Sequence, residues 1–504
     1  MTSGSSTPAP RQLVLHGHFY QPPREDPWTG VVPLQPSAAP YHDWNERITA
    51  ECYAPNTVVG VADDERDFVV NLFDHLSFNV GPTLLSWMEV HHRDVYDRIR
   101  AADRRSGRAI AQAYGHAVLP LCNERDLRTQ VRWGIVDFRH RFGRPPEGMW
   151  LPETAVSDAV LAVLAEEGIR FTLLAPGQIA AVRPLGQPDS AWVEHGIAPH
   201  EGLGPVDAAD PDAEPAPLDI TRALRWQHPN RADLGVDLVV YDGALAHALA
   251  FAAPTAQDIV AAVMTHLAGS GGLVAAATDG ETFGHHHKGA EHEVARALTV
   301  VAPASGVDTP RLVDVLDAEP PTHEAQVRVS AWSCAHGVGR WMADCGCRTG
   351  GEPGWSQAWR APLREAFDLL RDWGSDVFQR VGANLLHDPW AARDAYLAVL
   401  LGARSWDHFA AEHVSGDAHV AGLLLDAQRN ALLMYTSCGW FFNDLAGIET
   451  VQVLRYAART IDLFEQAGEV PPVDAFLEVL AGAASNDPEV GDGRTLWFDQ
   501  VLLH

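Results

Sequence analysis

The segment TDGETFGHHH places two carboxylates and three consecutive histidines directly after GGLVAAA, an apolar run of strand length. The acids are Asp279 and Glu281, and the first histidine is His285. Carboxylates and imidazoles transfer protons in many enzymes, and both are common metal ligands. The segment therefore predicts a proton-transfer site or a metal site, with a histidine-rich polar loop as the simpler alternative.

Polar side chains follow several other apolar, strand-like runs along the chain: His16, His18, His116, Glu153 and Asp242. In parallel α/β barrels and open sheets, the carboxyl ends of the strands form the edge at which active sites assemble. A single histidine at such a position is most often a hydrogen-bonded strand end. Because the coincidence recurs along the chain, we expect these residues to share one pocket with the TDGE segment.

Glu153 and Asp279 fit a pair of catalytic carboxylates. One would attack an anomeric carbon, while the other protonates the leaving oxygen and then activates water or a hydroxyl. Such a retaining mechanism needs the two groups about 5–5.5 Å apart. It also needs environments that keep one group ionised and the other protonated. Nearby histidines would then donate hydrogen bonds to sugar hydroxyls.

His16, His18 and Asp279 also fit a divalent metal site. The two residues of a His-x-His pair point to the same face of a strand. A metal bound there would activate water for hydrolysis of an amide or ester. The residues alone leave both chemistries open.

Strand and helix signals alternate through the first part of the chain. GMWLPE reads as the end of a strand, Asp158 as a helix N-cap, Gly168 as a helix stop, and IRFTLLAP as the next strand. Such units build parallel sheets and barrels. Residues 183–234 are rich in Pro, Asp and Gly and predict a long surface insertion, and after about residue 305 helical periodicity predominates.

The net charge of -29 gives no electrostatic footprint for nucleic acid or an anionic membrane. The chain lacks a run of about 18 uninterrupted apolar residues, so no transmembrane helix is expected. Its start, MTSGSSTPAP, does not read as a secretion signal. Six cysteines in 504 residues do not make a disulfide scaffold. These features predict a cytoplasmic protein, whose oligomeric state the sequence leaves open.

Several of these segments together resemble glycoside hydrolase family 57. HGHFYQPP is similar to that family's His-x-His/Gln-Pro opening, GMWLPETA to its nucleophile segment, and TDGETFGHHH to its general acid/base segment. YGHAVLPL and VYDGALAHALAF are also similar to family segments. The similarity keeps the family's order over about residues 12–300, which makes it more specific than any single motif.

The resemblance implies an α/β fold in which an incomplete (β/α)7 barrel over residues 11–305 follows a disordered tail at 1–10. A C-terminal α-helical domain over 306–504 would contribute to the substrate cleft. The implied activity is retaining hydrolysis or transfer on α-1,4-glucans, of the amylase, 4-α-glucanotransferase or branching type, through a glycosyl-enzyme intermediate. No cofactor and no obligatory metal are implied, which favours the carboxylate pair.

The resemblance assigns the nucleophile to Glu153 and the general acid/base to Asp279. Substrate-binding residues are expected at His16, His18, His116, Trp150, Asp242, Glu281, His285, Trp332, Trp341 and Trp440. Where family members often have tryptophan, this chain has His286 and His287, so one subsite is expected to differ in shape.

Two other functions remain as alternatives. One is a metal-dependent hydrolase similar to polysaccharide deacetylases, which a chelator would inactivate. The other is a carbohydrate-binding protein without catalysis, which has no need of two catalytic carboxylates.

A compact Cys/His group lies in the second half of the chain: Cys334, His336, Cys345 and Cys347. Zinc is held by such ligands. The spacing matches no familiar zinc finger, however, and the alternation of Cys345 and Cys347 fits packing equally well. The sequence leaves metal binding at this group open.

Overall fold

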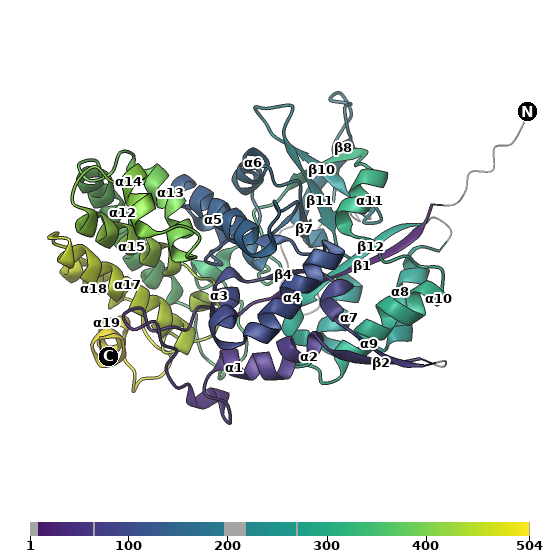
Figure 1. Cartoon of the computed structure of the whole chain (residues 1–504), viewed down its shortest axis with the longest axis horizontal. Helices are drawn as coiled ribbons and strands as arrows, with labels where there is room; N and C mark the ends of the chain where they lie inside the picture. The colour runs from purple at the N-terminus through teal and green to yellow at the C-terminus, as the bar shows by residue number, and fades with distance from the viewer. Residues whose placement is uncertain (1–8, 64–65, 196–217, 269–270, 503–504) are drawn as a thin grey trace, which may run out of the picture.

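The computed structural model describes residues 9–63, 66–195, 218–268 and 271–502 (Figure 1). The expected disordered tail at 1–10 lies almost entirely outside the described residues. So does the middle of the expected insertion, residues 196–217. Within the described residues, strands and helices alternate through the first part of the chain, as expected of an α/β protein.

Seven strands follow one another around the barrel: β1 (Arg11–Phe19), β4 (Ser77–Val80), β5 (Ala111–Gln112), β6 (Met149–Trp150), β7 (Phe171–Leu174), β11 (Gly235–Val240) and β12 (Gly272–Asp279). β1 pairs in parallel with both β12 and β4, β5 with β6, and β7 with β11. Parallel bridges at Phe78–Ala109 and Gly148–Phe171 join the next neighbours. A hydrogen bond of 2.7 Å from the Asp242 amide to the Ala275 carbonyl joins β11 to β12.

Helices cover the outside of these strands: α3 (Pro82–His91), α4 (Arg93–Ser106), α5 (Glu124–Phe142), α6 (Asp158–Glu166), α7 (Gly243–Ala252), α8 (Ala256–His266) and α9 (Ala290–Arg296). β1 is buried along nearly its whole length because parallel strands in barrels are covered on both faces. The α6 helix starts one residue earlier than expected. Its N-cap is Ser157, whose hydroxyl accepts from the Val160 amide, and Asp158 is the first helical residue.

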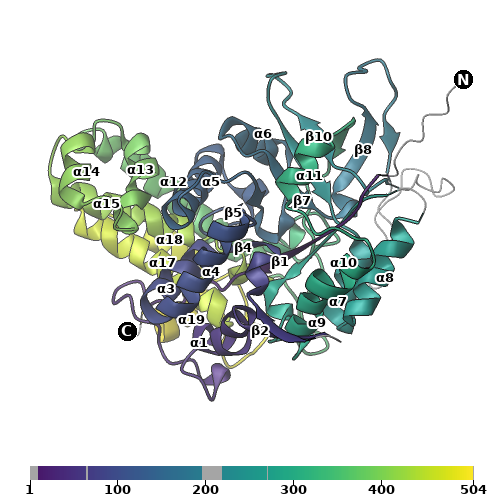
Figure 2. The ribbon, with the colours of Figure 1, turned by 45° about the vertical axis from the view of Figure 1, so that its right-hand side comes forward.

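The described part of the expected insertion forms strands rather than only a surface loop. β10 (Leu224–Gln227) pairs antiparallel with β11, and β8 (Ile179–Pro184) pairs with the short β9 (Val193–Glu194) and with β13 (His323–Val327). Figure 2 shows β8 and β10 beside α11 (Leu312–Ala318), on the side away from the C-terminal helices. β10 buries alternate residues, including Trp226, and this short pattern is hidden by the surrounding Pro, Asp and Gly. β13 also shows that strand structure continues beyond residue 305.

Helices account for most of the remaining chain: α12 (Arg360–Gly382), α13 (Pro389–Leu400), α14 (Trp406–His413), α15 (Ala418–Leu433), α16 (Cys438–Phe441), α17 (Ile448–Gln466), α18 (Val473–Leu480) and α19 (Gly493–Leu496). They lie together at the left of Figure 1, in green to yellow. A buried ion pair of 2.7 Å between Arg393 of α13 and Asp126 of α5 fastens them to the barrel. Within the described residues, no helix is both long and apolar enough to cross a membrane.

The helix α5 approaches the barrel wall through Gly134. A Cβ atom added there would lie 2.1 Å from the backbone oxygen of Gln112 on β5. We expect Gly134→Ala to displace β5 and to lower the free energy of unfolding by about 1–3 kcal/mol or more, as overpacking does. Thermal and denaturant unfolding measure the change.

Gly243→Ala is the matched control, because an added Cβ there has only ordinary contacts, the nearest with Pro176 at 3.8 Å. Alanine also favours the helix by about 1 kcal/mol over glycine. Equal losses of stability in the two variants would contradict the close approach of α5 to β5.

Candidate active site

Glu153 lies in a tight turn directly after β6, in a backbone conformation that L-residues rarely adopt. Its φ is 58° and that of Thr154 is 47°. Each such residue costs about 1–3 kcal/mol and persists only where the surroundings hold it. Here the Trp332 amide donates to the Glu153 carbonyl at 3.0 Å, and the Gln178 side chain donates to the Thr154 carbonyl at 2.7 Å. The strained turn therefore fixes the direction of the Glu153 side chain.

Three donors from distant parts of the chain surround the Glu153 carboxylate, which is 7% exposed. Ser437 donates to Oε1 at 2.9 Å, while Trp332 Nε1 and the Ser333 hydroxyl donate to Oε2 at 3.2 and 3.1 Å. Burial raises the pKa of Glu153, and the bonds from Ser437, Trp332 and Ser333 act in the opposite direction. Donors of this kind favour the ionised carboxylate over the protonated acid.

A chain of hydrogen bonds begins inside the barrel, behind this carboxylate. Ser77 lies 2.9 Å from His16 Nδ1, and His16 Nε2 lies 3.0 Å from Asn79 Oδ1. Asn79 Nδ2 lies 2.9 Å from His18 Nδ1. The parallel register of β1 and β4 places His16 opposite Ser77 and His18 opposite Asn79. The barrel strands themselves therefore set up this half of the chain.

The second half of the chain runs from His18 to the carboxylate. His18 Nε2 lies 3.2 Å from His116 Nε2, and His116 Nδ1 lies 2.8 Å from the Ser437 hydroxyl, which bonds Glu153. Ser437 is held against the segment that follows β5, because its amide donates to the His116 carbonyl at 2.9 Å. The bonds connect the barrel interior with a residue that precedes α16.

The three histidines are neutral because they are buried. Burial lowers the pKa of His16 to about 4 and that of His18 to about 3, and it lowers the pKa of His116 well below its usual value. Asn79 Oδ1 can only accept and Nδ2 can only donate. His18 Nδ1 lies closer to Asn79 Nδ2, at 2.9 Å, than to Oδ1, at 3.3 Å, so it accepts from the amide nitrogen. This geometry places the protons of His16 and His18 on Nε2 and that of His116 on Nδ1. In every hydrogen bond from Ser77 to Ser437, the donor is then the residue further from Glu153 along the series.

Both ring nitrogens of each histidine are thus bonded within the protein, so the expected contacts with sugar hydroxyls do not form through them. Trp150 is fully buried and stacks on His16 and His18, at ring-centroid distances of 4.8 and 5.0 Å. Tyr20 stacks on His116 at 3.7 Å. These residues form a layer behind Glu153 that orients its carboxylate through His116 and Ser437. The expectation that Trp150 contacts substrate is corrected accordingly.

Asp279 ends β12 at the level of His18 in the neighbouring strand β1. Its side chain is exposed to solvent, and none of the described residues has a hydrogen bond to its carboxylate. The surrounding protein nonetheless displaces part of its hydration, and this effect, together with the negative charges of Glu281 and Glu153, raises the pKa of Asp279 well above its usual value. The surroundings of Asp279 therefore disfavour its charge, whereas the burial of Glu153 is opposed by three donors that stabilise its charge.

Glu281 is buried two residues further on. Its Oε1 accepts from the Tyr20 amide at 3.0 Å and from the Tyr53 hydroxyl. Burial raises the pKa of Glu281 to about 7, against the opposing effect of these bonds. Glu281 is therefore part of the protein scaffold around Asp279 and also an ionisable neighbour of it.

The histidines after Glu281 have separate partners. His285 pairs with Glu51, and His287 Nε2 bonds the Ala250 carbonyl at 2.8 Å. Burial, followed by the charges of its two histidine neighbours, lowers the pKa of His286 to about 4. His285 remains 18% exposed at its side chain, so it keeps an accessible edge near the TDGE segment.

Asp242 has a structural role at the start of α7. One carboxylate oxygen accepts from the Leu245 amide at 2.9 Å as the helix N-cap, and the other lies 2.9 Å from His266. These contacts use both oxygens, which accounts for an acidic residue at this strand end without a bound sugar.

The other three expected tryptophans divide into two groups. Trp332 is half-buried and lies edge-on to Trp150 while bonding Glu153. Trp341 and Trp440 are fully buried in the core between the helices. Neither has a ring face open to a sugar, so the expectation that they form sugar platforms is corrected.

Sequence reasoning missed the residues that hold the carboxylates. Ser437, Ser333 and Asn79 are small polar residues without a distinctive spacing, and their partners lie far away in the chain. The segments that contain Ser333 and Ser437 stood out for their tryptophans and cysteines. The strand pattern that identified His16 and His18 could have indicated Asn79, which lies on the neighbouring strand.

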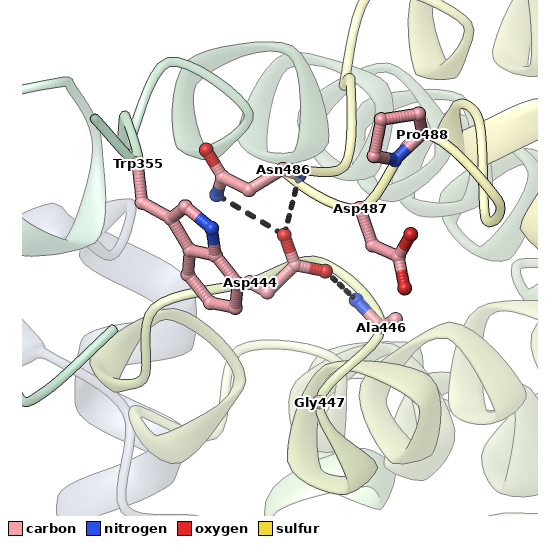
Figure 3. A pocket seen from close by; sticks show the side chains of 7 residues that line it. All are labelled: Trp355, Asp444, Ala446, Gly447, Asn486, Asp487 and Pro488. Carbon is pink, nitrogen blue, oxygen red and sulfur yellow. Dashed lines mark hydrogen bonds between the residues drawn. The ribbon is translucent and has the colours of Figure 1, made fainter. Parts of the chain in front are cut away.

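A pocket of about 460 Å³ lies elsewhere, between the chain at Trp355 and the segments around Asp444 and Asn486 (Figure 3). Asp444 accepts from the Asn486 amide at 2.6 Å and from the Ala446 amide at 2.9 Å. The second acid of this pocket, Asp487, accepts from the Glu489 amide at 2.9 Å. Both carboxylates of the pocket are therefore engaged by backbone amides. The carboxylate pair at Glu153 and Asp279 remains the candidate active site.

Two family models match the chain. The model described as glycosyl hydrolase family 57 matches residues 46–302, just over half of the 504 residues. A second model, described as a domain of unknown function (DUF3536), matches residues 355–503. The first covers most of the barrel strands, and the second covers the helices from α12 onward.

Solved structures share this fold. The exo-type maltose-forming amylase of Pyrococcus sp. ST04 is 14% identical with a TM-score of 0.69, over 93% of this chain and 82% of that one. The branching enzyme of Pyrococcus horikoshii is 15% identical with a TM-score of 0.54, over 94% of each chain.

A sequence relative matches a shorter stretch. Alpha-amylase 1 of Dictyoglomus thermophilum is 25% identical over 92 residues, which are 18% of this chain and only 13% of that relative.

The hydrogen-bond chain makes a prediction about proton positions. In ¹⁵N NMR spectra of the histidine-labelled protein at pH 5.5, we expect His16 and His18 to be neutral with the proton on Nε2. We expect His116 to be neutral with the proton on Nδ1. His42, whose side chain is 55% exposed, provides the comparison with an accessible ring. Imidazolium signals, or the opposite tautomers, from the three buried rings would contradict the assignment.

Proposed function

Because the chain belongs to glycosyl hydrolase family 57, we propose that it is a retaining enzyme that acts on α-1,4-glucans. Glu153 is the nucleophile and Asp279 the general acid/base in this proposal. The observation that carries it is the contrast between the two carboxylates. Glu153 is surrounded by three donors, whereas Asp279 accepts none from the described residues and faces two other acids.

The reaction proceeds in two steps in this proposal. A Glu153 carboxylate oxygen attacks the anomeric carbon as the glycosidic bond breaks, and Asp279 gives its proton to the leaving oxygen. Asp279, now ionised, then takes a proton from water or from a glucan hydroxyl, whose oxygen attacks the anomeric carbon and releases Glu153. Water yields hydrolysis and a glucan acceptor yields transfer, both with retained configuration.

The two environments differ in the direction that these roles require. An acid must be protonated before the first step and a nucleophile ionised, so their pKa values must be separated. Glu281 contributes by disfavouring the charge on Asp279. Once Asp279 has lost its proton, the same repulsion makes it a better base for the second step. Glu281, His285 and Trp332 are the neighbouring groups that we place near the substrate.

We also propose a two-domain organisation, with an incomplete (β/α)7 barrel over residues 11–305 and a helical domain over 306–504. The second part supplies Ser437 and the pair Trp332–Ser333 to the carboxylate of the first. The site is complete only when both parts are present.

The alternative of a metal-dependent, deacetylase-like hydrolase has less support. It required His16, His18 and Asp279 as ligands. Both ring nitrogens of His16 already face Ser77 and Asn79. Among the described residues, these three do not form a group whose ligand atoms could converge on a metal.

Glu153→Gln is expected to bind amylose normally and to lose nearly all turnover, because the amide is a poor nucleophile. Asp279→Asn is expected to lose about 10²–10⁴-fold in rate, the usual contribution of a general acid/base. Glu412→Gln on the surface of α14 is the control. Products from amylose and maltoheptaose, resolved by proton NMR and chromatography, distinguish hydrolysis, α-1,4 transfer and α-1,6 branching.

Rescue of alanine variants by azide, with α-maltosyl fluoride as substrate, distinguishes the nucleophile from the general acid/base. Glu153→Ala should yield the β-azide, because azide replaces the nucleophile in one inverting step. Asp279→Ala should yield the α-azide, because azide attacks the glycosyl-enzyme. Full activity in Glu153→Gln, or the reverse pattern of azides, would refute the assignment.

Glu281→Gln should shift the alkaline limb of the kcat/KM profile to lower pH. Removing the negative charge makes ionisation of Asp279 easier, so its pKa falls, by about one unit or more for a close like charge. Glutamine keeps an oxygen that can accept from Tyr20 and Tyr53. An alkaline limb that stays in place, with a correctly folded variant, would show that Asp279 does not control it.

A further inference from the structure

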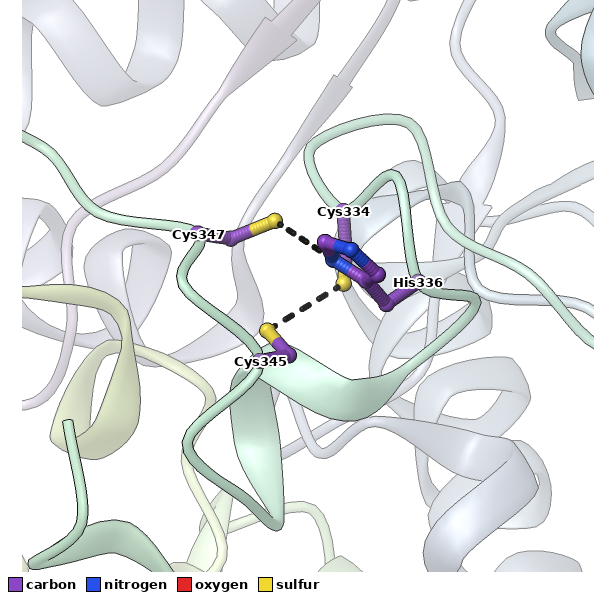
Figure 4. A group of neighbouring side chains, drawn as sticks. All are labelled: Cys334, His336, Cys345 and Cys347. Atoms are coloured by element: carbon purple, nitrogen blue, oxygen red, sulfur yellow. Dashed lines mark hydrogen bonds between the residues drawn. The ribbon is translucent and has the colours of Figure 1, made fainter. Parts of the chain in front are cut away.

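The four residues of the Cys/His group converge in space. Each offers one ligand atom, and all four atoms lie within 4.8 Å of one another. Figure 4 shows the side chains of Cys334, His336, Cys345 and Cys347 turned toward a common centre from two arms of one loop. It is the only such group of three or more potential ligands among the described residues.

The spacing of the ligand atoms matches tetrahedral coordination. With zinc–sulfur bonds of about 2.3 Å and zinc–nitrogen bonds of about 2.0–2.1 Å, a tetrahedron separates two sulfurs by about 3.8 Å and a sulfur from a nitrogen by about 3.6 Å. The Cys334 and Cys345 sulfurs are 3.9 Å apart, and the Cys347 sulfur is 3.4 Å from His336 Nδ1. A disulfide needs about 2.05 Å between sulfurs and would leave the third thiol unpaired.

The backbone of the loop is shaped to bring these atoms together. Gly346 has a φ of 83°, which lets the neighbouring Cys345 and Cys347 point to the same centre. A Cβ on Gly339 would lie 3.1 Å from the Cys345 Cβ. The Arg340 amide donates to the Cys334 sulfur at 3.4 Å, a bond that stabilises a thiolate.

Two buried arginines beside the group need negative charge. Arg340 is 4% exposed and Arg360 is fully buried. Arg340 donates to the Ser333 carbonyl and Arg360 to the Cys347 carbonyl. Within the described residues neither forms an ion pair with a carboxylate, and a buried cation without a counter-charge is strongly unfavourable. Three thiolates, one neutral imidazole and one Zn²⁺ carry a net charge of −1, which supplies it.

We propose that Cys334, His336, Cys345 and Cys347 bind one structural Zn²⁺ in a closed Cys3His site. Zinc fits because it prefers four thiolate and imidazole ligands in a tetrahedron, and with all four positions taken the metal has none open for water. Binding releases the thiol protons and crosslinks residues 334–347.

The zinc site is connected to the Glu153 carboxylate through the two residues that precede Cys334. Trp332 and Ser333 directly precede Cys334, and both donate to Glu153 Oε2. Arg340, inside the loop, holds the Ser333 carbonyl at 3.0 Å. The zinc ion therefore positions the donors of Glu153 and takes no part in bond making. The zinc proposal can be tested independently of the reaction proposed above, because metal content is measured without any substrate.

The test is the metal content of the full-length chain, produced in zinc-supplemented medium and freed of any histidine tag. Mass spectrometry of the metals should find about one zinc per chain. Cys347→Ser and His336→Ala should lose it, and their melting temperatures should fall by several degrees. Cys122→Ser is the matched control, because Cys122 is a free cysteine outside the group, and it should keep its zinc.

Cobalt exchange adds a readout on the wild-type protein itself and on one variant that keeps four ligands. The wild-type protein loaded with Co²⁺ should show the visible absorption of tetrahedral thiolate-bound cobalt. His336→Cys, which replaces the imidazole with a fourth thiolate, should bind both metals. Saturating zinc should protect three thiols of the wild-type protein from alkylation.

Three results would overturn the proposal. The first is a folded wild-type protein that holds no zinc after incubation with excess metal. The second is a Cys334–Cys345 disulfide in freshly prepared protein, found by peptide mass spectrometry. The third is iron bound in place of zinc at full occupancy.

Discussion

The arrangement of the active site follows from burying the negative charge of Glu153. A carboxylate that is 7% exposed needs donors, since an unpaired buried charge is strongly unfavourable. The barrel strand that bears Glu153 supplies none of its three side-chain donors. They come from residues 332, 333 and 437, which lie 179 to 284 positions further along the chain. The barrel and the later segments are therefore bound together by the electrostatics of one side chain.

The histidines of the barrel interior serve the same constraint. Ser437 accepts from His116 and donates to Glu153, so its hydroxyl is fixed in one direction. His18 and Asn79 fix His116 in turn. Because burial keeps the rings neutral, the chain of bonds places proton donors against the carboxylate without adding a positive charge. A charged imidazolium at His116 would stabilise Glu153 more strongly but would weaken it in its proposed role as nucleophile. The neutral chain orients the group and leaves its reactivity in place.

Residues on parallel strand ends could be placed from the sequence, and residues joined across the fold could not. His18 and Asp279 lie opposite each other because apolar runs marked both strands and parallel strands end at one edge. Ser437 had no such signal, since a serine contact formed over 284 positions leaves no local pattern. Trp341 and Trp440 were assigned to substrate through the family resemblance, but a tryptophan fits a core as well as a sugar platform, and both are fully buried. β10 was hidden because its four residues lie among Pro, Asp and Gly.

The loop over residues 331–347 must position donors of Glu153 although it has little regular secondary structure. Apart from the short helical turn Gly339–Trp341, it has no repeating hydrogen-bond pattern, yet it must hold Trp332 and Ser333 at hydrogen-bond distance from Glu153. Ordering each backbone residue costs about 1–2 kcal/mol in conformational entropy. Trp341 anchors one point of the loop in the core. A crosslink of four side chains to one ion orders the remainder and neutralises part of the charge of Arg340 and Arg360. The same loop then positions the carboxylate and balances the buried arginines.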